Sequence, residues 1–265
     1  MSQTLTPMDI RTPPPEDDEL AHVGLHAISL HGWFRADLGQ LYPGFPVGPE
    51  DVVADIGCGD GGASLFCARQ GARVILSDLD ADRLVRAGAR VAAAAPGRVE
   101  TRHGNGEALP IADATATRTI CMEVIEHVED PDALTAELFR ITRPGGLLLL
   151  ACPHPRSEAV QQEIAPPSYF AHPNHIRILQ PEHTVQHLAN AGFEIVRTDT
   201  YGFYEAVWWA MFWSTGVELG ERHPVFDAWA TTWKLMLQTK DGLRVQRALD
   251  SALPKSQVVI ARRPA

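Results

Sequence analysis

The sequence predicts an α/β fold in which helices cover both faces of a doubly wound, mostly parallel sheet. Short apolar runs alternate with segments of helical periodicity between residues 51 and 198, as right-handed βαβ crossovers require. One run, residues 147–152, is apolar throughout, which is typical of a parallel strand buried on both faces. Glycines crowd the chain directly after the first run. Together these features predict a Rossmann-like sheet with a ligand at the carboxyl ends of its strands.

The first predicted strand, residues 52–56, reads Val-Val-Ala-Asp-Ile and ends in a glycine turn. Gly57, Gly59, Gly61 and Gly62 fall within six positions. Residues without Cβ allow positive φ and let a ligand lie against the backbone, and the helix that follows offers unpaired N–H groups. A nucleoside-type cofactor is therefore expected at this turn.

The glycine spacing by itself leaves two cofactors open. Gly57-x-Gly59-x-x-Gly62 fits the dinucleotide fingerprint. Asp78, at the end of the second predicted strand, lies where that fingerprint places its ribose partner. An NAD-dependent oxidoreductase is thus one hypothesis that the turn supports.

The remaining elements are predicted from periodicity and from turn residues. Gly71, Pro96-Gly97 and Gly192 mark the ends of three helices, and Asp80 is placed to cap the second helix. The predicted strands cover residues 52–56, 73–77, 99–102, 117–122, 147–152, 193–197 and 257–261, and the predicted helices cover residues 63–70, 81–94, 131–141 and 181–191.

Changes in composition divide the chain into four regions. Residues 1–19 contain Pro13-Pro14-Pro15 and an acidic run, which predicts a disordered tail. Apolar residues from Leu20 to Leu38 predict a helical cap within residues 20–50. Residues 51–198 and 256–265 form the predicted cofactor-binding domain, and residues 199–255 form an aromatic-rich helical insertion.

Composition also limits the class of protein. The formal charge of −10 and the lack of a basic stripe argue against a nucleic-acid partner. The four cysteines make no C-x-x-C pair, so neither a zinc site nor a disulfide framework is predicted. No apolar run approaches the roughly 20 residues of a membrane span, and the first residues lack a signal-peptide pattern. We expect a cytoplasmic protein that binds a small molecule and is not stably inserted in a membrane.

Further motifs follow one another in the order found in a known family. They are Ala54-Asp-Ile-Gly-Cys-Gly-Asp-Gly61, Ser77-Asp-Leu-Asp80, Gly104-Asn-Gly-Glu-Ala-Leu-Pro110, Glu123-Val-Ile-Glu-His-Val-Glu-Asp-Pro131, Arg143-Pro-Gly-Gly146 and Ala191-Gly-Phe-Glu-Ile-Val196. With these motifs, residues 52–196 resemble the class I S-adenosylmethionine-dependent methyltransferases, in the branch of the ubiquinone-pathway enzymes. The resemblance implies a seven-stranded sheet with an antiparallel last strand. It also implies S-adenosyl-L-methionine as cofactor and S-adenosyl-L-homocysteine as product.

The resemblance assigns cofactor contacts whose chemistry suits the residues. Asp55 ends the first strand as a carboxylate that could receive the ammonium group of the methionine part. Asp78 can accept both ribose hydroxyls, although a plain helix cap is the alternative, and Leu79 offers the adenine an apolar face. The predicted cofactor-binding residues are Asp55, Gly57, Cys58, Gly59, Asp78, Leu79, Asn105, Gly106, Glu107 and Glu123.

Asn105 departs from the family pattern, which often has Asp at this position. Its amide oxygen can still accept a hydrogen bond from the adenine amino group, and a plain turn residue is the alternative. Gly106 leaves a backbone N–H for an adenine ring nitrogen, and Glu123 follows the fourth strand beside the sulfonium.

Methyl transfer to a hydroxyl group requires a general base, for which histidine has the most suitable unperturbed pKa. His127 is the predicted base because it follows the fourth strand at the carboxyl edge of the sheet. Glu123, Glu126 and His127 also form a set that could bind a divalent metal ion, as in some ubiquinone-pathway O-methyltransferases. The same pattern occurs in relatives that need no metal, where the histidine plugs the cleft or caps a helix.

Other histidines have competing interpretations. His172 and His175 follow the fifth strand and could face the acceptor, or they could bond to the backbone of their own loop. His22 and His26 have no third ligand in sight and are treated as surface residues.

The acceptor is inferred from the insertion, which holds five of the six tryptophans. If residues 207–213 form a lid over the cleft, the acceptor is apolar or aromatic. A packed core helix, a homodimer face or an interfacial helix would explain the same residues. The leading hypothesis is a methyltransferase acting on a small molecule at a hydroxyl oxygen. An NAD-dependent oxidoreductase and a non-catalytic cofactor-binding module are the alternatives.

Overall fold

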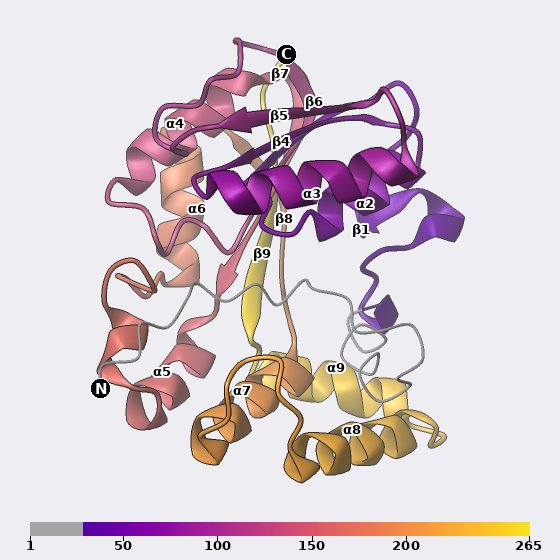
Figure 1. Ribbon diagram of the computed structural model, residues 1–265, viewed down its shortest axis with the longest axis vertical. Helices are drawn as coiled ribbons and strands as arrows, with labels where there is room; N and C mark the ends of the chain where they lie inside the picture. Colours follow the sequence, from indigo (N-terminus) through magenta and orange to yellow (C-terminus); the bar gives the residue numbers. More distant parts are fainter. Residues whose placement is uncertain (1–28) are drawn as a thin grey trace.

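The structure is a computed structural model of the chain, and it describes residues 29–265. The predicted tail, the first part of the predicted cap and the histidines His22 and His26 lie outside the described residues. A twisted central sheet has helices on both sides, and a group of three helices lies beyond one end of the sheet (Figure 1).

Seven strands form the central sheet in the order β5-β4-β3-β6-β7-β9-β8. Neighbouring strands from β5 to β7 are parallel, whereas β9 pairs antiparallel with both β7 and β8. The predicted fold class is thereby confirmed, including the antiparallel last strand. The strands are β3 (Val52–Ile56), β4 (Arg73–Asp78), β5 (Val99–His103), β6 (Ala116–Met122), β7 (Thr142–Pro153), β8 (Glu194–Tyr201) and β9 (Ser256–Arg262).

Two hydrophobic cores cover the two faces of the sheet. On β7, Leu147 and Leu149 belong to the core that contains α2 and α3, whereas Leu148 and Leu150 belong to the core that contains α4 and α6. This division follows from the alternation of side chains along a strand. The helices are α2 (Gly62–Arg69), α3 (Ala81–Ala94), α4 (Pro131–Ile141) and α6 (Pro181–Asn190).

Side-chain caps set the beginnings of two helices. The Asp80 carboxylate accepts a hydrogen bond of 2.9 Å from the backbone N–H of Arg83 at the start of α3, which confirms the predicted cap. At α4, the Asp130 carboxylate accepts hydrogen bonds from the backbone N–H groups of Asp132 and Ala133. Because α3 follows β4 and α4 follows β6, both helices begin at the carboxyl edge of the sheet.

The described part of the predicted cap, residues 29–50, is only partly helical. Residues 29–30 are helical, and they are followed by the 3-10 helix η1 (Ala36–Leu38) and a hairpin of β1 (Gln40–Tyr42) and β2 (Phe45–Pro46). The hairpin turn contains Gly44, which has a φ of 90°. Leu41, Tyr42 and Phe45 are fully buried in the core on the α2 side of the sheet, so this segment packs directly on the sheet.

The predicted insertion, residues 199–255, contains α7 (Phe203–Thr215), α8 (Pro224–Leu237) and α9 (Gly242–Ala252). Asp250 of α9 caps α7, because its carboxylate accepts hydrogen bonds of 3.1 and 2.9 Å from the N–H groups of Gly202 and Phe203. The three helices lie together beside α5 (Pro155–Ile164), the helix that follows β7 (Figure 1). The 3-10 helix η2 (Pro167–Phe170) continues the chain after α5.

Two further features concern the cysteines and the lengths of the helices. All four cysteines are free and buried. Among residues 29–265, none of the helices has both the length and the apolar character that crossing a bilayer demands. The cytoplasmic location stays a prediction.

Candidate active site

The glycine turn after β3 has a backbone conformation that favours glycine. Gly57, Gly59 and Gly61 have φ values of 65°, 52° and 76°, in the left-handed region that other residues rarely adopt. A Cβ atom on Gly57 would lie 2.2 Å from Cγ2 of Val124. The turn therefore packs its backbone directly against the chain that leaves β6.

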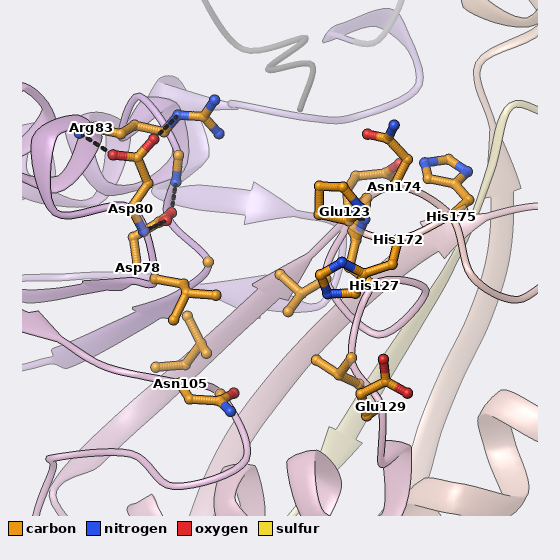
Figure 2. Close-up of a pocket in the computed structure, with 18 of the residues that line it drawn as sticks. Asp78, Asp80, Arg83, Asn105, Glu123, His127, Glu129, His172, Asn174 and His175 are labelled. Carbon is orange, nitrogen blue, oxygen red and sulfur yellow. Dashed lines mark hydrogen bonds and ion pairs between the residues drawn. The ribbon is translucent and has the colours of Figure 1, made fainter. Parts of the chain in front are cut away.

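A cavity of about 460 Å³ opens where β3, β4, β5 and β6 end. Figure 2 shows two groups of side chains across it, with Asp78 on one side and His127 and His175 on the other. What we call the cofactor end is lined by Gly57, Gly59, Asp78, Leu79, Asn105, Gly106 and Glu107. What we call the acceptor end is lined by Glu123, His127, Tyr169, His172, His175, Trp209, Trp213 and Lys255.

Asp78 holds the cofactor end together through backbone hydrogen bonds. One carboxylate oxygen accepts from the N–H of Gly59 at 2.8 Å, and the other accepts from the N–H of Asp80 at 2.9 Å. Each carboxylate oxygen can accept more than one hydrogen bond, so Asp78 can meet two hydroxyl groups while it fixes the turn. Leu79 beside it is 70% exposed and offers an apolar face to the cavity.

Asn105, Gly106 and Glu107 form a tight turn at the end of β5. The Asn105 amide oxygen accepts from the N–H of Glu107 at 3.1 Å, and its amide nitrogen donates to the Glu107 carboxylate at 3.2 Å. Glu107 also accepts from the N–H of Asp130 at 2.8 Å. A Cβ on Gly106 would lie 2.9 Å from Leu134. These contacts fix the backbone, and Asn105 has the turn role that was its alternative interpretation.

Asp55 and Cys58 are not among the residues that line the cavity. The contact expected of Asp55 with the ammonium group, directly or through water, and the cofactor contact expected of Cys58 stay predictions. Asp55 is fully buried, and its carboxylate accepts a hydrogen bond of 2.7 Å from the hydroxyl of Ser64 on α2. Cys58 is also buried, and its N–H donates to the carbonyl of Ser77 on β4. The strand points Asp55 into the interface with α2, so the carboxylate positions the turn from below.

Glu123 has an ion pair that the sequence did not predict. Its carboxylate accepts hydrogen bonds from the Lys255 ammonium and, at 2.9 Å, from the hydroxyl of Ser256. Burial opposes ionisation, but the Lys255 charge and these hydrogen bonds hold the pKa of Glu123 below its ordinary value. The backbone of Glu123 has a φ of 56°, which is unusual for a residue with a side chain.

Lys255, the partner of Glu123, lies outside the sequence motifs. It precedes β9, which runs antiparallel to its neighbours. The amino end of β9 therefore lies beside the carboxyl ends of the parallel strands, where ligands collect. The sequence feature that could have indicated this partner is the pair Lys255-Ser256 at the start of the last strand.

Of the predicted metal ligands Glu123, Glu126 and His127, Glu123 is paired with the Lys255 ammonium group. A different set, Glu126, His127 and His175, has potential ligand atoms within 4.8 Å of one another. Such a set of one carboxylate and two imidazoles could hold a divalent ion, and the metal stays a prediction.

His127 reaches the cavity as predicted. Its Nδ1 bonds to the carbonyl of Pro173 at 3.0 Å, and its Nε2 is 3.7 Å from the Glu126 carboxylate. Burial lowers the pKa of His127. Glu126 is 2% exposed, and burial together with the Glu123 charge raises the pKa of Glu126 to about 8. His127 is thus a neutral imidazole next to a carboxyl group that resists ionisation.

His175 and His172 lie on the loop after η2, and both line the cavity. His175 Nδ1 lies 2.8 Å from the carboxylate of Glu158, which is 3% exposed. The Tyr169 hydroxyl donates to the other oxygen of Glu158 at 3.3 Å. Glu158 and Tyr169 carry no sequence motif, and only their placement on α5 and η2 identifies them.

The insertion contributes two of its tryptophans to the acceptor end. Trp209 and Trp213 of α7 line the cavity, and the indole N–H of Trp213 donates to the Gln161 amide of α5 at 2.5 Å. Trp208, in contrast, stacks on Phe226 of α8. One face of α7 therefore closes the acceptor end, as a lid would, while the other face packs against the insertion.

Comparisons with known proteins place this architecture in a family. The family described as "Methyltransferase domain" matches residues 54–150. A protein of Mycolicibacterium smegmatis named "Probable S-adenosylmethionine-dependent methyltransferase" is 32% identical over 152 residues, which are 57% of this chain and 54% of the relative. Residues 54–150 therefore match a methyltransferase domain, and the chain is similar to S-adenosylmethionine-dependent methyltransferases. The resemblance seen in the motifs is thereby confirmed for this part of the chain.

Two further comparisons show how much of the chain is similar to known proteins. A ubiquinone biosynthesis O-methyltransferase of Rhizobium etli is 32% identical over 163 residues, which are 57% of this chain and 62% of the relative. The chain spans about half the length of the curated relatives that it matches first, at 54%. The structure of a geranyl diphosphate C-methyltransferase from Streptomyces coelicolor has a TM-score of 0.58 at 18% identity, covering 98% of this chain and 91% of that one. It shows the same fold.

Proposed function

We propose that this methyltransferase transfers the methyl group of S-adenosyl-L-methionine to a hydroxyl group of a small apolar or aromatic molecule. The observation that supports the proposal most directly is one cavity that joins the glycine turn and Asp78 to imidazole and indole rings. Donor and acceptor can therefore occupy adjacent parts of the same space. A hydride-transfer enzyme would also use acid–base groups at the acceptor end, so the binding of the two cofactors has to separate these hypotheses.

The cofactor end fits an adenosyl group through features of its own. Gly57 and Gly106 both line the cavity, and a Cβ atom at either position would collide with Val124 or Leu134, so glycine lets these turns pack tightly beside the ligand space. Asp78 retains acceptor capacity for the two ribose hydroxyls, and the exposed Leu79 provides an apolar surface for adenine. Asp55 supports the turn from below. When bound, S-adenosyl-L-methionine supplies a methyl group activated by its sulfonium.

The acceptor end selects the acceptor by shape and polarity. Tyr169 and Trp213 meet edge to face with ring centroids 5.3 Å apart, and Trp209 lies 5.9 Å from Trp213. Aromatic walls bind flat apolar molecules and exclude water. Of the three histidines that line the cavity, His127 and His175 have ring centroids 5.0 Å apart, and a neutral imidazole can accept a proton from a hydroxyl group. The chain's own contribution to rate is then alignment of acceptor, methyl carbon and sulfur, together with removal of that proton.

Ligand binding tests the first half of the proposal. Isothermal titration calorimetry should register heat from S-adenosyl-L-homocysteine and none from NAD⁺. The thermal midpoint should rise with the same ligand, because selective binding to the native state stabilises it. Binding of NAD⁺ alone would sink the proposal.

Methyl transfer tests the second half. The purified chain, radiolabelled S-adenosyl-L-methionine and a panel of catechols, substituted phenols and aromatic amines should give labelled ethers from the hydroxyl compounds. Labelled products from amines only would reject the hydroxyl acceptor and keep the methyltransferase. Matched aliphatic alcohols of similar size test the preference for an aromatic ring.

A further inference from the structure

We propose that His175 is the general base that removes the acceptor's proton and that Glu158 is the positioning residue that orients its ring. The inference rests on the proposed methyl transfer to a hydroxyl group and deepens it. It gives a role to Glu158, a buried residue of α5 that lies well outside the Glu123–Pro131 motif.

The Glu158 side chain determines which nitrogen of His175 carries hydrogen. A carboxylate has only acceptor oxygens, so the 2.8 Å contact requires a hydrogen on Nδ1. The neutral ring then keeps its lone pair on Nε2. The second oxygen of Glu158 accepts from the Tyr169 hydroxyl, which fixes the carboxylate in turn. This is the arrangement by which a buried carboxylate orients a catalytic imidazole.

The surroundings hold the His175 ring at the cavity. The ring of Tyr169 lies 4.4 Å from it and the ring of His127 lies 5.0 Å from it, between centroids. The backbone N–H of His175 donates to the carbonyl of Tyr169 at 3.1 Å. With 12% of its side chain exposed, His175 lines the acceptor end and leaves little room for bulk water.

His127 lacks the same support. Its Nδ1 contacts the neutral carbonyl of Pro173, which orients the ring but offers no charge to offset an imidazolium. Its Nε2 is directed toward Glu126 at 3.7 Å. The charged and titratable groups described around the two rings are Glu123, Glu126, Glu158, Tyr169 and Lys255. Among these, Glu158 alone forms a hydrogen bond to a ring nitrogen. His175 is therefore the ring better prepared to take a proton.

The step balances without any further reactant. The acceptor O–H bond breaks, its electron pair stays on oxygen, and the proton forms an N–H bond at Nε2 of His175. The oxygen pair forms the new C–O bond to the methyl carbon while the C–S bond breaks and its pair returns to sulfur. The products are a methyl ether, neutral S-adenosyl-L-homocysteine and an imidazolium that stays paired with Glu158 until its proton passes to water.

The E158Q variant tests the positioning role without an acceptor. The Tyr169 hydroxyl should keep donating to the amide oxygen, so the amide NH₂ group faces Nδ1 and forces hydrogen onto Nε2. Nitrogen-15 NMR of ring-labelled histidine, with S-adenosyl-L-homocysteine bound, should show Nδ1–H in the wild type and Nε2–H in E158Q. The H175Q variant assigns the signal. A wild-type ring with hydrogen on Nε2 would overturn the proposal.

The catalytic role of His175 is tested by steady-state kinetics with catechol as the acceptor. E158Q should lower kcat about 100-fold or more with KM changed less than threefold. E163Q is the matched control, because Glu163 is an exposed residue of the same helix, and it should leave kcat unchanged. The double variant E158Q/Y169F frees the amide to turn its oxygen toward His175, so it should recover both the Nδ1–H form and part of kcat.

Three results would contradict the base assignment. One is an E158Q enzyme with wild-type kcat, and another is an H175Q enzyme that stays active while H127Q loses activity. The third is a stoichiometric divalent metal in the purified protein, detected by mass spectrometry, whose removal abolishes turnover. If the wild type methylates no hydroxyl compound, the proposed function and the base role fall, while the NMR result still decides whether Glu158 positions His175.

Discussion

The two ends of the cavity are built in different ways. At the cofactor end, Asp78 and Asn105 bond to backbone or side chains in three short segments, each directly after a strand. At the acceptor end, Glu123 meets Lys255 across 132 positions of the chain, and Trp213 meets Gln161 across 52 positions. The first end is fixed by local turns, whereas the second depends on how distant elements pack.

This difference determines which residues can be substituted at each end of the cavity. The turns at the cofactor end are held by Asp78 and Asn105, which bond to backbone N–H groups of segments that directly follow strands. Aromatic and charged side chains from α5, α7 and β9 can change without disturbing those turns. The acceptor end is therefore where related chains can differ in substrate while they share the cofactor end.

The largest effect is expected from separating Lys255 and Glu123. Both side chains are nearly buried, with 11% and 14% exposed, and removing one partner leaves an uncompensated charge. K255M should lower the free energy of unfolding by about 3 kcal/mol in urea titrations. Affinity for S-adenosyl-L-homocysteine should change less than threefold if the two ends are independent.

The double variant E123Q/K255M sharpens this result. With both charges gone, it should be more stable than K255M, and the cycle should give a clear coupling energy. K240M at an exposed lysine serves as the control and should leave stability unchanged. A large loss of cofactor affinity in K255M would show that the ends are coupled after all.

The next largest effect concerns the cofactor end. D78A should weaken binding of S-adenosyl-L-homocysteine about 100-fold, because it removes two ribose acceptors and frees the N–H groups of Gly59 and Asp80. Calorimetry gives the affinity directly. D82A, at an exposed position of α3, is the matched control. Unchanged affinity in D78A would remove the basis of the cofactor assignment.

The contrast between the ends also explains what could be predicted from sequence. The positions of Gly57, Gly59, Asp78, Leu79 and residues 105–107 at the cavity could be predicted, because ligand-binding turns follow strand ends and glycines. The sequence pattern does not reveal that the Asp55 side chain bonds to Ser64 of α2, because a strand-end carboxylate can face either the cleft or a helix. The ion pair of Glu123 with Lys255 could not be predicted either, because Lys255 precedes another strand. Contacts between side chains that meet only through tertiary packing have no fixed spacing in the sequence, so they cannot be predicted from it.

Glu126 predicts a smaller effect that depends on pH. Burial first, and the charge of Glu123 second, raise the pKa of Glu126 to about 8, whereas the unfolded value is near 4.5. Between these values the folded state holds a proton that the unfolded state releases, so Glu126 lowers stability as pH rises from 4.5 to 8. E126Q should therefore lose less stability than the wild type over this range, on the order of 2 kcal/mol.

Urea titrations at several pH values measure this difference. E182Q, at an exposed position of α6, should follow the wild-type profile. Parallel profiles for E126Q and the wild type would indicate that Glu126 is ionised in the folded state, and the acceptor end would then hold a second negative charge beside Glu123.

The smallest effect is expected at the lid. W213F keeps an aromatic ring at the cavity but loses the N–H that donates to Gln161, a hydrogen bond worth about 1 kcal/mol net. KM for the acceptor should rise about fivefold while affinity for S-adenosyl-L-homocysteine stays constant, because Trp213 lines only the acceptor end. W208F on the same helix is the control, since Trp208 packs on Phe226 and away from the cavity. Equal effects of the two substitutions would mean that α7 serves the stability of the insertion and not the recognition of the acceptor.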